Sequence, residues 1–117
     1  MIQANELRSG NYLFDDNKPT KIWSEDICDI ENGLCVFDPI PLTPEILEKC
    51  GFENILNKLY FEMNFGNLYF SYRIDNKMFC IAEGKYDKIE VAYTIEYLHQ
   101  LQHLYFALTG NELKINL

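Results

Sequence analysis

The pattern of hydrophobic and polar residues predicts a long amphipathic helix near residue 100. From Thr94 to Gly110 the apolar side chains recur at helical spacing. Thr94 can cap the first turn with its hydroxyl group, and Gly110 can adopt the left-handed conformation that ends a helix. We expect the helix to lie across a sheet with these residues in the core: Leu98, Leu101, Leu104, Tyr105 and Leu108. Residues 112–117 alternate and indicate a final strand or an extended tail.

The stretch before this helix has the period of two that is typical of β-strands. We predict four strands, separated by polar breaks that contain Gly or Asn, over residues 60–64, 68–74, 78–82 and 88–93. Consecutive hairpins of this kind form an antiparallel meander. In the second strand the pattern predicts Leu68, Phe70, Tyr72 and Ile74 on the inner face, with Tyr69 and Ser71 facing outward.

The N-terminal part of the chain predicts a hairpin over residues 11–23, with its turn in the segment Asp15–Pro19. Trp23 is the only tryptophan, and we expect it in the core or at the end of a barrel, because large aromatic side chains dominate small cores. Residues 24–33 are acidic and irregular and favour a solvated loop or an edge-strand bend. Residues 34–37 favour a short buried strand.

Three prolines between residues 39 and 44 predict an extended crossing that ends in a short helix. Thr43 is a suitable N-cap and Pro44 a suitable first residue, and Gly51 marks the end, which predicts a helix over Pro44–Cys50. The predicted fold class is therefore α+β: a meander-like, curved and partly barrel-like antiparallel sheet, packed by a C-terminal amphipathic helix, with one short helix mid-chain. At 117 residues without repeats or linkers, the chain is expected to form a single domain.

The formal net charge of -8 disfavours direct binding to nucleic acids and to anionic membrane surfaces, since both require basic patches. Two readings of the acidity stay open: it keeps a small protein soluble, or it mimics a nucleic acid in a basic protein groove. The N-terminal segment has no apolar run, and no stretch approaches the length of a membrane span, so we expect a cytoplasmic location. Cys28 and Cys35 could pair across a hairpin, although no secretion signal accompanies them.

Candidate chemistry is confined to one face of the predicted C-terminal helix. His99 and His103 are four residues apart with Glu96 one turn earlier, so the two imidazoles could share a metal ion. The alternative is two exposed histidines on a solvated helix face, because the chain has no further histidine and two ligands fall short of a usual site. The sequence has no phosphate-binding loop and no nucleophile elbow. We therefore predict no catalytic residue and no cofactor site, and we favour a protein that is not an enzyme.

Three segments together resemble a set of small uncharacterised proteins of Bacteroides-type gut bacteria. They are Asn5-Glu6-Leu7-Arg8 with Gly10-Asn11, then Pro39-Ile40-Pro41-Leu42-Thr43 leading to Lys49-Cys50-Gly51-Phe52, and finally His99-Gln100-Leu101-Gln102 with residues 104–110 and Glu112-Leu113. The family pattern usually has Asn where this chain has His103, which weakens the idea of a two-histidine metal site. The resemblance implies an origin in a prophage or mobile element and implies no activity.

The leading functional hypothesis is a non-catalytic protein-interaction module with an unidentified protein partner. Its expected contact residues are the outward aromatics Tyr69, Tyr86 and Phe106. One alternative is a small metal-dependent or hydrolytic enzyme that uses the face with His99, His103 and Glu96. The other alternative is an acidic nucleic-acid mimic that inhibits a host enzyme.

Overall fold

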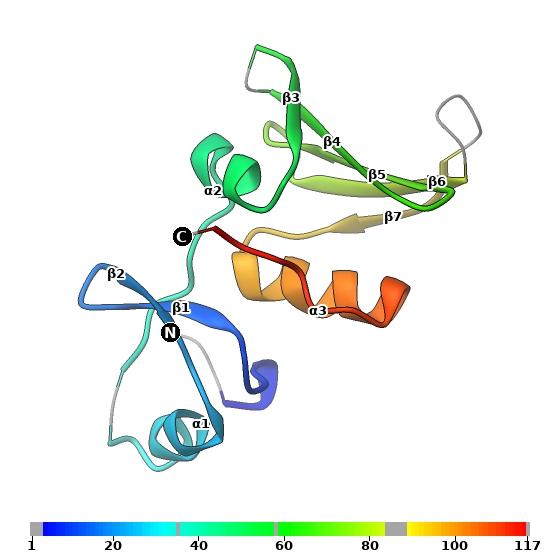
Figure 1. Cartoon of the computed structure of the whole chain (residues 1–117). Helices are drawn as coiled ribbons and strands as arrows, with labels where there is room; N and C mark the ends of the chain where they lie inside the picture. Colours follow the sequence, from blue (N-terminus) through cyan, green and yellow to red (C-terminus); the bar gives the residue numbers. More distant parts are fainter. Residues whose placement is uncertain (1–3, 35, 58, 84–88, 117) are drawn as a thin grey trace.

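The computed structural model describes residues 4–34, 36–57, 59–83 and 89–116, and it has two antiparallel sheets (Figure 1). The first sheet is the hairpin of β1 (Tyr12–Asp15) and β2 (Lys18–Lys21). The second has five strands in sequence order: β3 (Glu53–Leu56), β4 (Tyr60–Phe65), β5 (Leu68–Arg73), β6 (Met78–Glu83) and β7 (Ile89–Thr94). The α+β class and the antiparallel meander are confirmed, and the sheet is open rather than closed into a barrel.

Four helical elements complete the described chain. A 3-10 turn, η1 (Ala4–Glu6), precedes the hairpin, and α1 (Ser24–Glu31) follows it. The predicted mid-chain helix is α2 (Pro44–Lys49), which begins as expected because the Thr43 hydroxyl accepts from the amide of Ile46 at 3.3 Å. The C-terminal helix is α3 (Leu98–Thr109), and it ends at Gly110, whose φ is +73°. No helix among the described residues has the length and apolar character needed to cross a bilayer.

The sequence prediction of a loop over residues 24–33 is wrong, because this segment forms α1. The carboxylate of Asp26 accepts from the backbone N–H of Trp23 at 2.8 Å and so caps the helix. Acidic residues at the start of a helix also suit its dipole. Ile27 and Ile30 share one side of α1 and pack on a small second core, which consists of Leu13, Ile22 and Phe37.

Other predictions about the N-terminal half are also wrong. Trp23 is 54% exposed, because it follows the buried Ile22 and therefore points to the opposite side of the chain. Lys21 covers its ring instead, with the ammonium nitrogen 5.1 Å from the ring centre. The buried strand over residues 34–37 is absent from the described part of this stretch, in which Leu34 and Val36 are exposed and only Phe37 is buried.

The start of α3 also differs from the prediction. Thr94 is the last residue of β7 and does not cap the helix. The side-chain oxygen of Gln100 accepts from the backbone N–H groups of Glu96 and Tyr97, at 2.8 and 3.1 Å, and these bonds hold the turn into the helix. After α3, residues 111–116 form an extended tail rather than a strand. Leu113 is buried in the main core, and the amide of Asn116 donates to the carbonyl of Lys49 at 2.9 Å.

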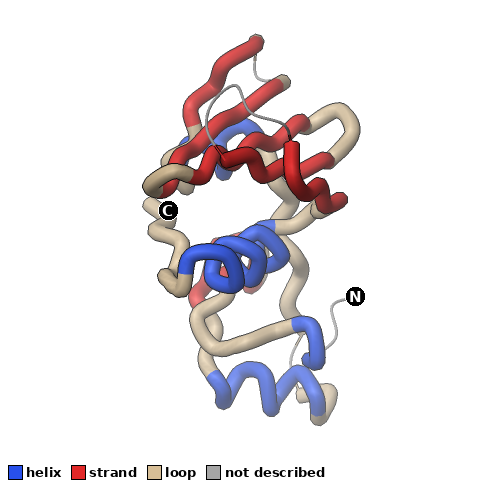
Figure 2. The backbone as a smooth tube through the Cα atoms, turned by 90° about the vertical axis from the view of Figure 1, so that its right-hand side faces the viewer, coloured by secondary structure: helices blue, strands red, loops and turns tan. Residues whose placement is uncertain are grey.

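The main core lies between the five-stranded sheet and α3. The predicted inner face of β5 is confirmed, since Phe70 and Tyr72 are buried and Leu68 and Ile74 pack against the core. From α3, Leu98 and Leu101 are fully buried, and the other predicted core residues of this helix pack on the cluster with partial exposure. Figure 2 shows that α3 is a middle layer, with the five-stranded sheet on one side and the N-terminal hairpin with α1 on the other.

Candidate functional site

The second face of α3, the one turned away from the five-stranded sheet, contacts the N-terminal part of the chain. The sequence predicted this face to be solvated, and that prediction is wrong: His99 is 3% exposed and Gln102 is 2% exposed. Strand β1 contacts α3 on this side, and the N-terminal part of the chain lies against the helix (Figures 1 and 2). We call this contact the polar junction, formed by Arg8, Gly10, Asn11, Tyr12, His99, Gln102, His103 and Glu112.

Gln102 joins α3 to the hairpin with two hydrogen bonds. The backbone N–H of Tyr12 donates to its side-chain oxygen at 2.9 Å, and its amide nitrogen donates to the carbonyl of Gly10 at 3.1 Å. The amide group thus satisfies one donor and one acceptor of partly buried backbone at the start of β1. Such groups are costly to leave unpaired, so Gln102 fixes the position of the hairpin on the helix.

Asn11 is fully buried beside His103 and determines which nitrogen of that ring carries the proton. The side-chain oxygen of Asn11 accepts from the backbone N–H of Arg8 at 2.8 Å, and it lies 2.8 Å from Nε2 of His103. Because this oxygen is an acceptor in both contacts, Nε2 of His103 carries the proton and donates. The Asn11 amide nitrogen and Nδ1 of His99 are buried polar atoms without a hydrogen-bond partner among the described residues.

Burial controls the pKa of both histidines. The pKa of His99 is lowered to about 4, mainly because burial disfavours the charged ring and also because His103 is near. The pKa of His103 is lowered by burial and then by the neighbouring Arg8 cation. The two ring centres are 6.0 Å apart in an edge-to-face arrangement, and the ring of Tyr97 stacks on His99. At neutral pH both rings are therefore uncharged parts of a packed interface.

Arg8 connects three parts of the polar junction. Its guanidinium group forms a two-bond salt bridge with Glu112 at 2.7 and 3.2 Å, and it lies 4.6 Å above the ring centre of Phe106. A weaker bond of 3.4 Å joins it to the carbonyl of Gln102. The carboxyl pKa of Glu112 is lowered, chiefly by the hydrogen bond from Arg8. These contacts tie the N-terminal segment to the start of the C-terminal tail.

The structure does not bring the three metal candidates together. Glu96 lies before α3 and forms a salt bridge with Lys77 at 2.7 Å, so its carboxylate is engaged away from the histidines. Within the described ranges, no group of three His, Cys, Asp or Glu side chains has an arrangement that could hold a metal ion. The pair of histidines is thus placed for packing and hydrogen bonding.

The predicted contact residues lie on separate surfaces. Tyr69 is on the side of the five-stranded sheet turned away from α3, as expected from its neighbour Phe70 on the core side. Phe106 is 43% exposed and lies at the edge of the polar junction, where the guanidinium group of Arg8 covers its ring. Tyr86 lies outside the described residues. The proposed pairing of Cys28 with Cys35 also involves a residue outside them.

The side of the sheet that carries Tyr69 has no second layer among the described elements (Figures 1 and 2). We call it the outer face. The strand registers place these residues of β4 to β7 on it: Tyr60, Glu62, Asn64, Tyr69, Ser71, Arg73, Met78, Cys80, Ala82, Ala92 and Thr94. Glu62 and Arg73 are the charged residues of this described set, a share close to the 24% of the whole chain, and Glu53 of β3 lies beside Glu62 on the same face.

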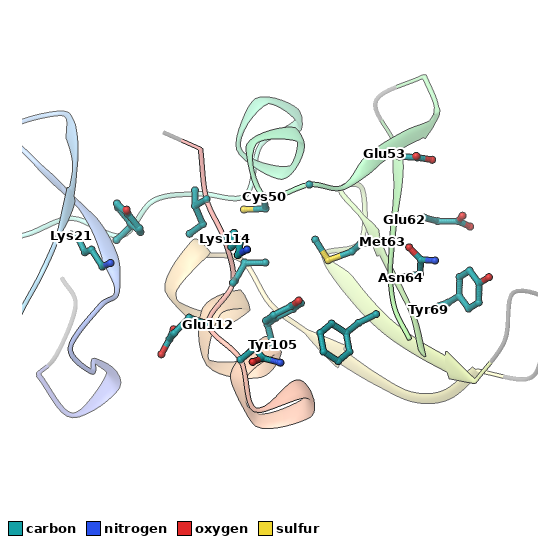
Figure 3. Close-up of a pocket in the computed structure, with 16 residues that line it drawn as sticks. Lys21, Cys50, Glu53, Glu62, Met63, Asn64, Tyr69, Tyr105, Glu112 and Lys114 are labelled. Atoms are coloured by element: carbon teal, nitrogen blue, oxygen red, sulfur yellow. The ribbon is translucent and has the colours of Figure 1, made fainter. Parts of the chain in front are cut away.

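A groove of about 1150 Å³ lies between the C-terminal tail, α3 and the end of β4 (Figure 3). Figure 3 shows that Glu53, Glu62 and Tyr69 point away from Tyr105 and Glu112, toward the outer face of the sheet. The groove is therefore open space around β4 and does not gather polar groups at one point. Its thiol, Cys50, has a pKa raised to about 12 by burial and is not a nucleophile near neutral pH.

One feature of the sequence could have revealed the polar junction. The residues of α3, from Leu98 to Thr109, include no Asp, Glu, Lys or Arg. A helix face that contacts water is normally charged, whereas this one carries histidine and glutamine, which suit a packed polar contact. The first and last of the three segments in the family resemblance meet at this junction.

Comparison with protein-family models, curated proteins and solved structures found no match to the chain.

Proposed function

We propose that this protein is a non-catalytic protein-interaction module, of phage or mobile-element origin, whose contact surface is the outer face of the five-stranded sheet. One observation carries the proposal: this face has no covering layer among the described elements, and the side chains of Tyr60, Tyr69 and Met78 lie on it. An antiparallel sheet that faces water on one side normally alternates hydrophobic and polar residues. Large aromatic and thioether side chains on an uncovered face make it the candidate binding surface.

Several apolar residues of this face are neighbours in the sheet. Tyr69 is directly opposite Ala82 and Cys80 is opposite Ala92, whereas Met78 begins β6 between Arg73 and Thr94. Glu62 and Asn64 on β4 and Thr94 on β7 form a polar margin. Ser71 and Arg73 lie on the central strand β5, so the face mixes apolar and polar side chains, as many protein–protein interfaces do.

The two alternatives have less support. For an enzyme, His99 and His103 would need to line an accessible site, and they are instead covered within the polar junction. For a nucleic-acid mimic, the exposed carboxylates would need to follow one surface. They occur on α1, on the β1–β2 turn, on α2 and on β3, and three more are in salt bridges. Neither alternative has an observation of its own that favours it.

The proposal is tested by capture with matched surface variants. The chain and the variants Tyr69→Glu and Phe106→Glu are each immobilised and exposed to a lysate of a Bacteroides-type bacterium that also contains untagged chain. Both variants replace a ring with a carboxylate, but only the first alters the outer face. We expect the parent and Phe106→Glu to retain a protein that Tyr69→Glu loses. Retention of no protein at either low or high salt contradicts the proposal.

A further inference from the structure

We propose that the polar junction is a pH-sensitive contact: protonation of His99 and His103 releases residues 4–38 from α3 as one body, which turns about Pro39. We call residues 4–38 the N-terminal unit. The inference goes beyond the proposed function and does not depend on it, because α3 and the sheet separate the polar junction from the outer face (Figure 2). It rests on the position of the two histidines between two separate cores.

The N-terminal unit has a core of its own, so it can move without unfolding. Leu13, Ile22 and Phe37 are buried in this core, and every described residue that packs on it lies within residues 7–37. A backbone hydrogen bond from the N–H of Ile22 to the carbonyl of Asn11, at 2.8 Å, continues the hairpin beyond its ladder. None of these contacts involves α3.

The connection to the rest of the chain defines the hinge. Asp38 exchanges two backbone hydrogen bonds with Phe14, at 2.8 and 3.0 Å, and therefore belongs to the N-terminal unit. Two residues later, the carbonyl of Ile40 accepts from the N–H of Leu98 at 2.8 Å, which fixes this part of the chain to the start of α3. Pro39 is the one residue between the two attachments. Rotation about the backbone bonds next to it moves the unit as a whole.

The contacts that hold the N-terminal unit against α3 are largely polar. Among the described residues of the unit, Tyr12 and Phe14 are the apolar side chains that pack on the main core, and both are only partly buried. The other contacts are the hydrogen bonds of Gln102 and His103 and the salt bridge of Glu112. Water replaces such bonds when the unit leaves, so opening the junction costs less than unfolding either core.

Protonation of the rings disfavours the closed junction for a geometric reason. His99 is 3% exposed, and its Nδ1 has no hydrogen-bond partner among the described residues. A charged imidazole has an N–H on both nitrogens, so protonation buries a charge and a donor that meets no described acceptor. In His103, Nε2 already donates to Asn11, and the added charge is repelled by the neighbouring Arg8 cation. In the open state water hydrates both rings.

The surrounding charges act in both directions and do not cancel this effect. The charged and titratable side chains near the two rings are Glu6 of η1, Arg8, Tyr97 at the start of α3 and Glu112 of the tail, with Lys21 of β2 acting on Glu112. Glu6 favours a charged His99, and Glu112 favours a charged His103. Burial is the larger influence at each ring, so the pKa of both histidines is lowered in the closed state.

The direction of the pH effect follows from these pKa values. The pKa of His99 is about 4 in the closed state, whereas the hydrated ring of the open state titrates near about 6.5. The open state therefore binds protons more tightly, and the closed state is favoured above pH ~6.5 and is lost as the pH falls toward 4. His99 alone should raise the equilibrium constant for opening about 30-fold between pH 7.5 and pH 5.0, and His103 adds to this rise.

The experiment is amide hydrogen exchange of the full chain at these two pH values, with each rate divided by its intrinsic rate. The N–H of Tyr12 reports the opening, because its acceptor is the side-chain oxygen of Gln102 at 2.9 Å. The N–H of Ile22 reports the integrity of the unit, and that of Leu98 reports the fixed side of the hinge. We expect Tyr12 to be less protected than Ile22 and Leu98 at both pH values, and its protection to fall about 30-fold or more on acidification.

Matched variants separate the titration of the rings from other effects of acid. In the double variant His99→Asn with His103→Asn, the protection of Tyr12 should change less than about threefold between the two pH values. The control is Glu112→Gln, which breaks the salt bridge but keeps both rings, and which should retain a change of at least about 30-fold. The full change in the double variant overturns the inference. Two results of the parent chain alone do so as well: equal protection of Tyr12 and Ile22, or a change at Tyr12 below about threefold.

Discussion

The two faces of α3 are buried to a similar degree by different means. On the sheet side, Leu98 and Leu101 pack among aliphatic and aromatic side chains. On the opposite side, His99 and Gln102 are equally covered, and the contacts there are directional hydrogen bonds to the N-terminal part of the chain. Hydrophobic periodicity detects only the first kind of contact. A face that is buried through polar groups looks like a solvated face in the sequence.

The largest effect is expected on the apolar face. Leu101→Ala removes a side chain that is 1% exposed and leaves a cavity between α3 and the sheet. The free energy of unfolding should fall by about 3 kcal/mol, which equilibrium unfolding in urea measures. The control is Leu108→Ala on the same face, which is only partly buried and should lose clearly less. Equal losses in the two variants would show that the sheet does not cover the first turns of the helix as described.

A smaller but distinct loss is expected on the polar face. Gln102→Ala leaves the N–H of Tyr12 and the carbonyl of Gly10 without their partner, which should cost about 2 kcal/mol. Hydrogen exchange at Tyr12 should accelerate more than exchange at Phe70 in the five-stranded sheet, because only the hairpin contact is lost. An equal acceleration of exchange at Tyr12 and Phe70 would mean that the contacts on the two faces of α3 are lost together.

The histidines add a pH dependence to the polar face. The pKa of His99 in the folded protein is about 4, below its value of about 6.5 in the unfolded chain. Protons therefore bind the unfolded chain first, and stability that is present above pH ~6.5 is lost as the pH falls toward 4. Between pH 7.5 and pH 5.0 this amounts to up to about 2 kcal/mol from one ring.

Urea unfolding of the parent and of His99→Asn at these two pH values measures this contribution. The difference in unfolding free energy between pH 7.5 and pH 5.0 should be smaller in the variant, because Asn does not titrate. Carboxylates titrate in both proteins and cancel in the comparison. The same pH dependence in both would show that His99 titrates normally and is not buried.

The smallest effect is expected at the edge of the polar junction. Glu112→Gln breaks the salt bridge with Arg8, whose partners are both partly exposed to solvent. Exposed ion pairs of this kind contribute no more than about 1 kcal/mol and are screened by salt. The loss in unfolding free energy should therefore shrink at high salt. A large, salt-independent loss would instead place Arg8 among the residues that hold the junction together.

The sequence predicted four of the five strands, β4 to β7, because their alternation and the breaks between them are clear, and it missed the short edge strand β3. The turn at Gly66, with φ of +58°, and the alternation around Phe70 are both local signals of the β4–β5 hairpin. By contrast, α1 has only Ile27 and Ile30 to mark its buried side, among four acidic residues. So short a helix depends on the second core for its stability, and that tertiary contact is not visible in its own sequence.

The candidate surface was predicted only in part. Alternation placed Tyr69 outward, and the structure adds that no described layer covers its neighbours across β4–β7. Phe106 looked like a contact residue because its covering group, Arg8, is almost a hundred residues away along the chain. The histidines looked solvated for the same reason, since Asn11 is equally distant from His103. Long-range polar pairs leave no local periodic signal.

The place of α3 between the two sheets has a consequence for synthesis on the ribosome. Translation proceeds from the N-terminus, so the hairpin and all five strands of the larger sheet are made before Leu98 emerges. Until then, Phe70 belongs to a half-finished core and the nascent chain exposes apolar surface that invites aggregation, whereas the second core around Leu13 needs only residues 7–37. A ribosome paused before residue 98 should therefore present a client for chaperones, and the addition of α3 should release it.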